Sequence, residues 1–338
     1  MAATVRYGGY KDYPSALHAA YEHFDKESHS YAVAEDFSSV SIAEIESNES
    51  LLRFLRDYYL RKHGKGCTEA ALFRALADRN RSMIEWLPVP RRVELGERAF
   101  RSLPNEEQFS AIAVLQNRSV EDVREQYDQA VSAGTPKMKA FAQVLQAEPI
   151  QGIITGVDLE TTSGNPERGY IINVGWEQME MARGASAQIA HSQMAGLPDW
   201  YEFTGIPFDN VHHLTWDDLH AVAPFRENKQ LQKILLDALK EHPFMAHNAF
   251  FEDAWLTLHL DGYAEAKVAG EIKIIDSMTI SKALEGNQKS NGGHSLDAWA
   301  HRLGVLTDGE SEKHLGLDDT DLMLRCAIAE FARNNMLK

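Results

Sequence analysis

Residues 150–162 read IQGIITGVDLETT, an apolar, β-branched run that ends on two acids. Its composition predicts a buried strand. Side chains alternate along a strand, so Asp158 and Glu160 project on one side and Leu159 on the other. Two carboxylates held together repel each other unless a cation lies between them. The chain must therefore fold so that this strand end meets either solvent or a positive ion.

The segments after residue 150 predict an α/β domain, with a mixed sheet flanked by helices. Strands are expected at residues 150–160, 170–181, 185–194, 243–248 and 272–278, the first three as an antiparallel meander. Helices are expected at residues 227–242 and 250–260 and near the C-terminal end. Ligands on such sheets gather at strand ends, and the two acids lie at one.

The sequence of residues 1–148 predicts a separate accessory domain that is mostly α-helical. Residues 149–338 are predicted to form the α/β domain. Within the first part, residues 106–116 and 120–131 read as two helices around a tight turn. A DNA-reading helix-turn-helix and an ordinary helix pair share that pattern. Residues 132–137, SAGTPK, form the best candidate linker.

The net charge of -16 argues against a protein that coats nucleic acid through a broad basic surface. The acid excess lies in the C-terminal part, whereas residues 51–101 are rich in Arg and Lys. If the protein holds a polyanion, this stretch is the expected contact, and a protein partner could also bind through the N-terminal domain. Solvated helix faces would give the same pattern.

Three features predict a cytoplasmic protein without a membrane segment. The chain has only two cysteines, Cys67 and Cys326, which form no CxxC pair. Its longest apolar stretches are too short to span a bilayer. The N-terminal residues contain no apolar region of the kind that secretion signals have.

Further acids follow the later elements, in HNAFFEDAWL and in HLGLDDTD. Acids at strand ends and on helices that converge on one place would form a carboxylate cage. Such hard oxygen ligands suit Mg²⁺ or Mn²⁺ rather than zinc. Two ions in one cage are the arrangement used for in-line displacement at phosphorus.

The chain contains, in order, DLETT, AHNAFFEDAWL and HLGLDDTDLML. These segments resemble the three exonuclease motifs of the DEDDh family, the proofreading-type 3′–5′ exonucleases. The resemblance covers residues 150–335 and leaves residues 1–148 uncovered. It implies a ribonuclease-H-like fold for the C-terminal domain and two Mg²⁺ or Mn²⁺ ions per site.

Position by position, the resemblance makes Asp158, Glu160 and Asp319 metal ligands. It makes His314, five residues before Asp319, the general base. The related family with a tyrosine base would place that base four residues before the aspartate, where this chain has Leu315.

The second motif departs from the family pattern HNAxFD, because this chain reads HNAFFED. Without a gap, Glu252 takes the aspartate's place as metal ligand; a shift by one residue would use Asp253. The apolar residues Phe251, Trp255 and Leu256 match the family's helix face only without a gap. The shift would swing the acid about 100° around the helix. Glu252 is therefore the favoured ligand.

The resemblance also implies substrate contacts and a reaction. Thr161 and the backbone at Leu159 would meet the terminal nucleotide, and His247 and Asn248 would shape the strand end near it or only support the loop. His314 would take a proton from a metal-bound water, and nucleoside 5′-monophosphates would leave one by one. The favoured substrate is the 3′ end of single-stranded DNA; an exoribonuclease is the alternative, and a non-catalytic binding or scaffold module is less favoured.

Overall fold

The computed structural model describes residues 106–338 apart from 165, 167–168 and 200, with only the backbone of 203 and 204. The predicted helices before residue 106 and the basic stretch 51–101 lie outside the described residues. The described residues fall into two compact units. The larger contains residues 106–160, 171–195 and 222–338; the smaller contains residues 161–170 and 196–221.

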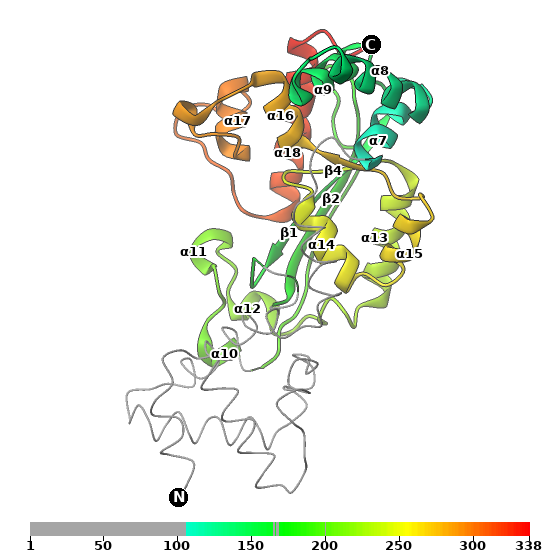
Figure 1. Ribbon diagram of the computed structural model, residues 1–338. Coiled ribbons are helices and arrows are strands. Elements are labelled where there is room, and N and C mark those ends of the chain that lie inside the picture. The colour runs from blue at the N-terminus through cyan, green and yellow to red at the C-terminus, as the bar shows by residue number, and fades with distance from the viewer. Residues whose placement is uncertain (1–105, 165, 167–168, 200) are drawn as a thin grey trace, which may run out of the picture. The chain divides into compact units, whose positions relative to one another are not determined.

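A five-stranded mixed sheet forms the centre of the larger unit (Figure 1). The strands are β1 (Ile153–Thr161), β2 (Ile171–Glu180), β3 (Ile189–Met194), β4 (Phe244–Ala246) and β5 (Ile274–Asp276). They lie in the order β3-β2-β1-β4-β5. Strand β4 pairs in parallel with β1 and β5, and β3 pairs antiparallel with β2. This confirms the predicted mixed sheet.

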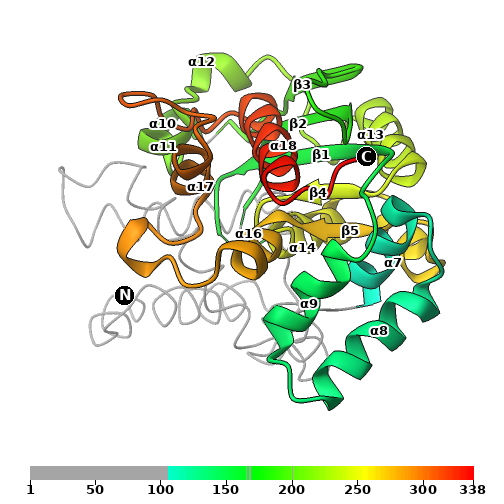
Figure 2. The ribbon, with the colours of Figure 1, turned by 90° about the horizontal axis from the view of Figure 1, so that it is seen from above.

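Helices cover both faces of this sheet (Figure 2). One face carries α16 (Ser277–Glu285), α17 (Leu296–Leu303) and α18 (Gly316–Arg333), with a short 3₁₀ turn, Lys289–Asn291, before α17. The other carries α13 (Lys229–Glu241), α14 (Phe250–His259) and α15 (Tyr263–Val268). The alternation of strand side chains explains the two layers, because Phe244 and Ala246 enter one core and Met245 the other.

Three further helices pack at the β5 end of the sheet: α7 (Glu106–Gln116), α8 (Val120–Ser132) and α9 (Lys137–Gln146). Helix α7 packs on β5, and α9 packs on α16. The turn between α7 and α8 ends at Ser119, whose hydroxyl accepts a hydrogen bond from the Asp122 N–H. These helices belong to the same compact unit as the sheet. The division of the whole chain near residue 148 stays a prediction.

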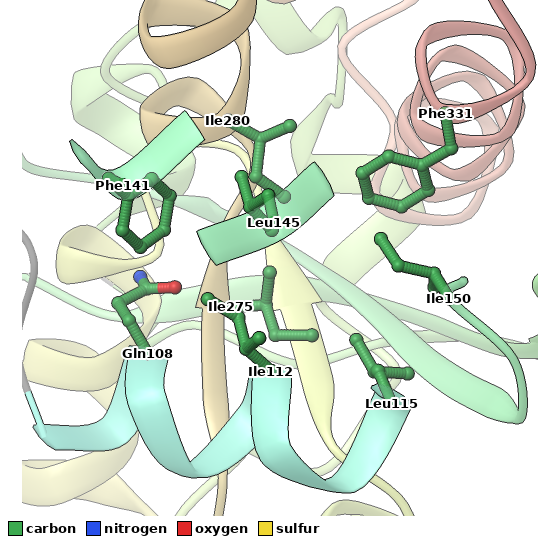
Figure 3. Close-up of a pocket in the computed structure, with 9 residues that line it drawn as sticks. All are labelled: Gln108, Ile112, Leu115, Phe141, Leu145, Ile150, Ile275, Ile280 and Phe331. Carbon is green, nitrogen blue, oxygen red and sulfur yellow. The ribbon is translucent and has the colours of Figure 1, made fainter. Parts of the chain in front are cut away.

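A small apolar cavity of about 10 Å³ lies where these helices meet the sheet (Figure 3). That volume is about one water molecule, but almost every lining group is hydrocarbon, so the space is a packing defect rather than a binding site. The lining side chains are Gln108, Ile112, Leu115, Phe141, Leu145, Ile150, Ile275, Ile280 and Phe331.

The described residues of the smaller unit form three short helices, α10 (Tyr201–Thr204), α11 (Asp209–His212) and α12 (Trp216–Leu219). Thr215 caps α12, because Asp218 accepts hydrogen bonds from both its N–H and its hydroxyl. Among all the described residues, no helix is long and apolar enough to cross a membrane.

Candidate metal centre

Two acids of β1 project toward the face of the sheet that carries α18. Val157 and Leu159 are buried in the core beneath α13 and α14, so Asp158 and Glu160, which alternate with them, point the other way. Both acidic residues are only partly exposed. The strand thus places two carboxylates at its end, on the side where the C-terminal helix lies.

Helix α18 reaches these acids because its first residue rests directly on the sheet backbone. A Cβ atom built on Gly175 would lie 2.0 Å from the carbonyl carbon of Gly316 and from the nitrogen of Leu317. The Gly316 N–H donates to the Asn173 side-chain oxygen at 3.0 Å. Only a pair of glycines allows backbones to approach this closely. Asp319, one turn into the helix, is therefore carried to the strand end.

The structure brings three predicted ligands together. One carboxylate oxygen from each of Asp158, Glu160 and Asp319 lies within 4.8 Å of the other two. Burial raises the pKa of Glu160 to about 8 and that of Asp319 to about 6, and neighbouring acids add to both shifts. Burial, then Glu160 and Glu252, raises the pKa of Asp158 well above its usual value. Without a cation, the Asp158 carboxyl group strongly favours its protonated form.

The two candidates from the second motif are adjacent on α14 and point in directions about 100° apart. The Asp253 carboxylate is bound by residues of α15, receiving hydrogen bonds from Lys267 Nζ at 2.6 and 2.7 Å and from the Tyr263 hydroxyl at 3.0 Å. Glu252 is equally buried, but its Oε2 has no hydrogen-bond partner in the part of the chain that the structure describes. Its pKa is raised well above the usual value, chiefly by burial, with contributions from the charges of Asp276 and Glu160.

A divalent cation fits this set of donors. These partly and fully buried carboxylates repel one another and need a positive charge, and the Glu252 oxygen that has no hydrogen-bond partner among the described residues needs a ligand. All the donors are hard oxygens, which suit Mg²⁺ or Mn²⁺.

His314 lies at the edge of the cluster, in the loop before α18. Its Nδ1 is 3.9 Å from Oδ2 of Asp319 and 3.5 Å from Oε1 of Glu312. The backbone at His314 is left-handed, with φ 54°. The sequence contained no clear indication of Glu312. Its one distinguishing feature is that this acid lies two residues before His314 in an irregular loop. Such spacings occur often by chance in a chain with 50 acidic residues.

His247 and Asn248 sit in the turn between β4 and α14. The His247 ring donates from Nε2 to the His294 carbonyl at 2.7 Å, and its Nδ1 is 2.9 Å from the Ser277 hydroxyl. Asn248 has φ 68° and donates its N–H to Asp276 at 3.0 Å. These bonds support the loop, as one of the two sequence interpretations expects. Contact of either residue with a substrate stays a prediction.

The remaining predicted substrate contacts lie at the end of β1. The Leu159 side chain is buried in the core, and contact of its backbone with a substrate stays a prediction. The Thr161 hydroxyl donates to the Ser163 carbonyl at 2.8 Å. Thr161 belongs to the smaller unit, so its part in substrate binding also stays a prediction.

The solved structures that this chain resembles include two 3′-exonucleases. No protein-family model and no curated protein matches the sequence. One solved structure, of a 3′-exonuclease in 3′-end-specific recognition of a histone mRNA stem-loop, is 16% identical with a TM-score of 0.42. The match covers 55% of this chain and 84% of that one. Another, a full-length 3′-exonuclease, is 14% identical with a TM-score of 0.43, covering 68% and 83%. A likeness of this size carries no argument about function, which rests on the side chains.

Proposed function

We propose that this protein is a metal-dependent 3′–5′ exonuclease of the DEDDh type. The observation that carries the proposal is the convergence of Asp158, Glu160 and Asp319, with the buried Glu252 carboxylate beside them. These residues come from the end of one strand, β1, and from two helices, α14 and α18, that are far apart in the sequence. A purely solvated set of surface acids would have neither this burial nor this mutual repulsion.

Asp158, Glu160 and Asp319 would hold one divalent ion, and Asp158 with Glu252 would hold a second. Such ions lower the pKa of a bound water and stabilise negative charge at the scissile phosphate. His314, beside Asp319, would accept the proton of the attacking water. The product would be a nucleoside 5′-monophosphate, released from the 3′ end of the substrate.

The substrate class follows from the chemistry and not from a recognition surface. The cluster would act on a phosphodiester with a free 3′ end, and we propose single-stranded DNA first and RNA as the alternative. The same acids would serve either polymer. The preference for deoxyribose or ribose is therefore an outcome of the experiment.

The test uses 5′-labelled single-stranded DNA and RNA with the full chain in Mg²⁺ or Mn²⁺. We expect a ladder that shortens from the 3′ end, and its loss in Asp158→Ala by about 10²-fold or more, equivalent to roughly 3 kcal/mol of barrier. Asp321→Ala is the matched control, because Asp321 lies on α18 but forms an exposed ion pair with Arg325.

Two results would count against the proposal. If neither polymer shortens, the fold serves binding or scaffolding instead. If Asp158→Ala retains the wild-type rate while Asp321→Ala behaves the same way, the activity comes from another site or from a contaminant.

A further inference from the structure

The loop between α17 and α18 carries a second acid, Glu312, beside the proposed base. Its Oε1 lies 3.5 Å from His314 Nδ1, closer than the 3.9 Å that separates this nitrogen from Asp319. The Glu312 side chain is only 20% exposed. Glu312, His314 and Asp319 can each bring one ligand atom within 4.8 Å of the others.

Glu312 is fixed in place by the first turn of α17. Its N–H donates to Oδ1 of Asp297 at 3.3 Å. This bond ties the loop to the first turn of α17, at a helix N-terminus, where a negative charge is stabilised. The acid is therefore held by the scaffold.

The two acids near His314 differ in what else they do. Asp319 accepts the Lys313 N–H at 3.2 Å and belongs to the carboxylate cluster with Asp158 and Glu160. An ion held there would engage its charge. Glu312 lies outside that group of three carboxylates, and its ion-pair contact among the described residues is with the His314 imidazole.

We propose that Glu312 is a positioning residue for His314, and this inference rests on the proposed exonuclease function. By accepting a hydrogen bond from Nδ1–H, Glu312 selects the tautomer whose Nε2 lone pair can take a proton from water. It also stabilises the imidazolium that this transfer creates. An acid that orients a histidine base in this way is a general device of enzymes that activate a nucleophile.

The central variant is Glu312→Gln, which keeps the shape and removes the charge. We expect kcat to fall about 10- to 100-fold, as when a partner that orients a histidine is changed. KM for the labelled oligonucleotide should stay the same, and so should Mn²⁺ affinity by calorimetry. Asp308→Asn is the matched control: it removes one charge from an exposed residue of the same loop, and all three quantities should stay at wild-type values.

A spectroscopic readout separates positioning from simple structural support. In metal-free protein with ¹⁵N-labelled histidine, long-range correlation should show His314 as the Nδ1–H tautomer, assigned through its loss in His314→Ala. In Glu312→Gln the tautomers should mix, while thermal unfolding stays near that of wild type.

Each other outcome is decisive. Loss of Mn²⁺ affinity in Glu312→Gln would make this residue a metal ligand and overturn the proposal. An unchanged kcat or an unchanged tautomer would overturn it too. If the wild-type protein cleaves no nucleic acid, the proposed function fails, whereas the tautomer result still shows whether Glu312 orients His314.

Discussion

Glu252 and Asp253 are adjacent acids of α14 with different surroundings and different predicted roles. Glu252 is buried beside the cluster, and one of its oxygens has no hydrogen-bond partner within the described ranges, while Asp253 neutralises Lys267, whose side chain is only 12% exposed. Glu252→Gln should lower kcat by about 10²-fold, equivalent to ~3 kcal/mol. It should leave the melting temperature of the metal-free protein unchanged or raise it, because a neutral amide replaces an acid whose charged form burial disfavours.

Asp253→Asn is the matched control for this prediction, with the same change on the next residue. It should destabilise the fold by about 1–3 kcal/mol, because Lys267 loses its charged partner, although Glu107 lies 3.7 Å away. Its activity per folded molecule should remain. Thermal unfolding and single-turnover cleavage measure both effects, and the reverse pattern would make Asp253 the ligand.

The sequence pattern indicated that acids at the end of β1 and on the C-terminal helix converge, and the resemblance to the DEDDh exonucleases then singled out Asp319 on that helix. The pattern did not indicate Glu312 or Asp276. Asp276 ends β5 as Asp158 nears the end of β1, yet its carboxylate accepts the backbone N–H groups of Asn248, Ala249 and Met278. In the sequence, an acid at a strand end that accepts backbone hydrogen bonds has the same pattern as one that binds a cation. Only their contacts in the folded protein distinguish them.

The close packing of α18 on β2 sets the position of Asp319 in the carboxylate cluster. Gly175→Ala would place a methyl group 2.0 Å from the Gly316 backbone, so the helix must shift. We expect a loss of about 1–3 kcal/mol in the free energy of unfolding. Activity should fall by more than 10²-fold, because an ångström of misplacement is enough for such a loss.

Gly164→Ala is the control for this change, since a Cβ there meets no atom within 4 Å and the backbone is in an ordinary region. It should leave both the urea midpoint and the cleavage rate at wild-type values. A fully active Gly175→Ala enzyme would show that the close contact does not set the position of Asp319.

The elements themselves followed from the sequence where a single local signal dominated. The period of apolar residues in 227–242 and the β-branched content of 150–160 predicted α13 and β1 correctly. The glycine contact between β2 and α18 was not predictable, because Gly175 and Gly316 are 141 positions apart (316 minus 175) and nothing local marks either as a contact. Long-range packing of this kind is decided by the whole fold.

The stability of the folded protein depends on pH, because buried carboxyl groups bind protons more tightly in the folded state than in the unfolded chain. Glu160 has its pKa raised to about 8, and burial raises that of Glu177, on β2, to about 7, against 4.5 for an ordinary glutamate. Between pH 4.5 and about 8 the folded protein retains protons on these two carboxyl groups that the unfolded chain has released. Its free energy of unfolding therefore falls as pH rises. Buried His247, with a lowered pKa, acts in the opposite direction below pH 6.5. The clearest window is therefore pH 6.5 to about 8.

In that window the metal-free protein should melt at a progressively lower temperature as pH rises, by about 2–4 °C for each ~1 kcal/mol lost. Mn²⁺ should reverse the fall, most strongly at pH 8, because the ion replaces the protons that the cluster otherwise retains. Glu177→Gln should remove only its own share of the slope and leave the Mn²⁺ effect intact. Asp158→Asn should flatten the slope and abolish the Mn²⁺ effect, because it removes both the repulsion and a ligand. A metal-free melting temperature that stays level across this window, or a Mn²⁺ response that survives in Asp158→Asn, would show that these acids do not share a cation.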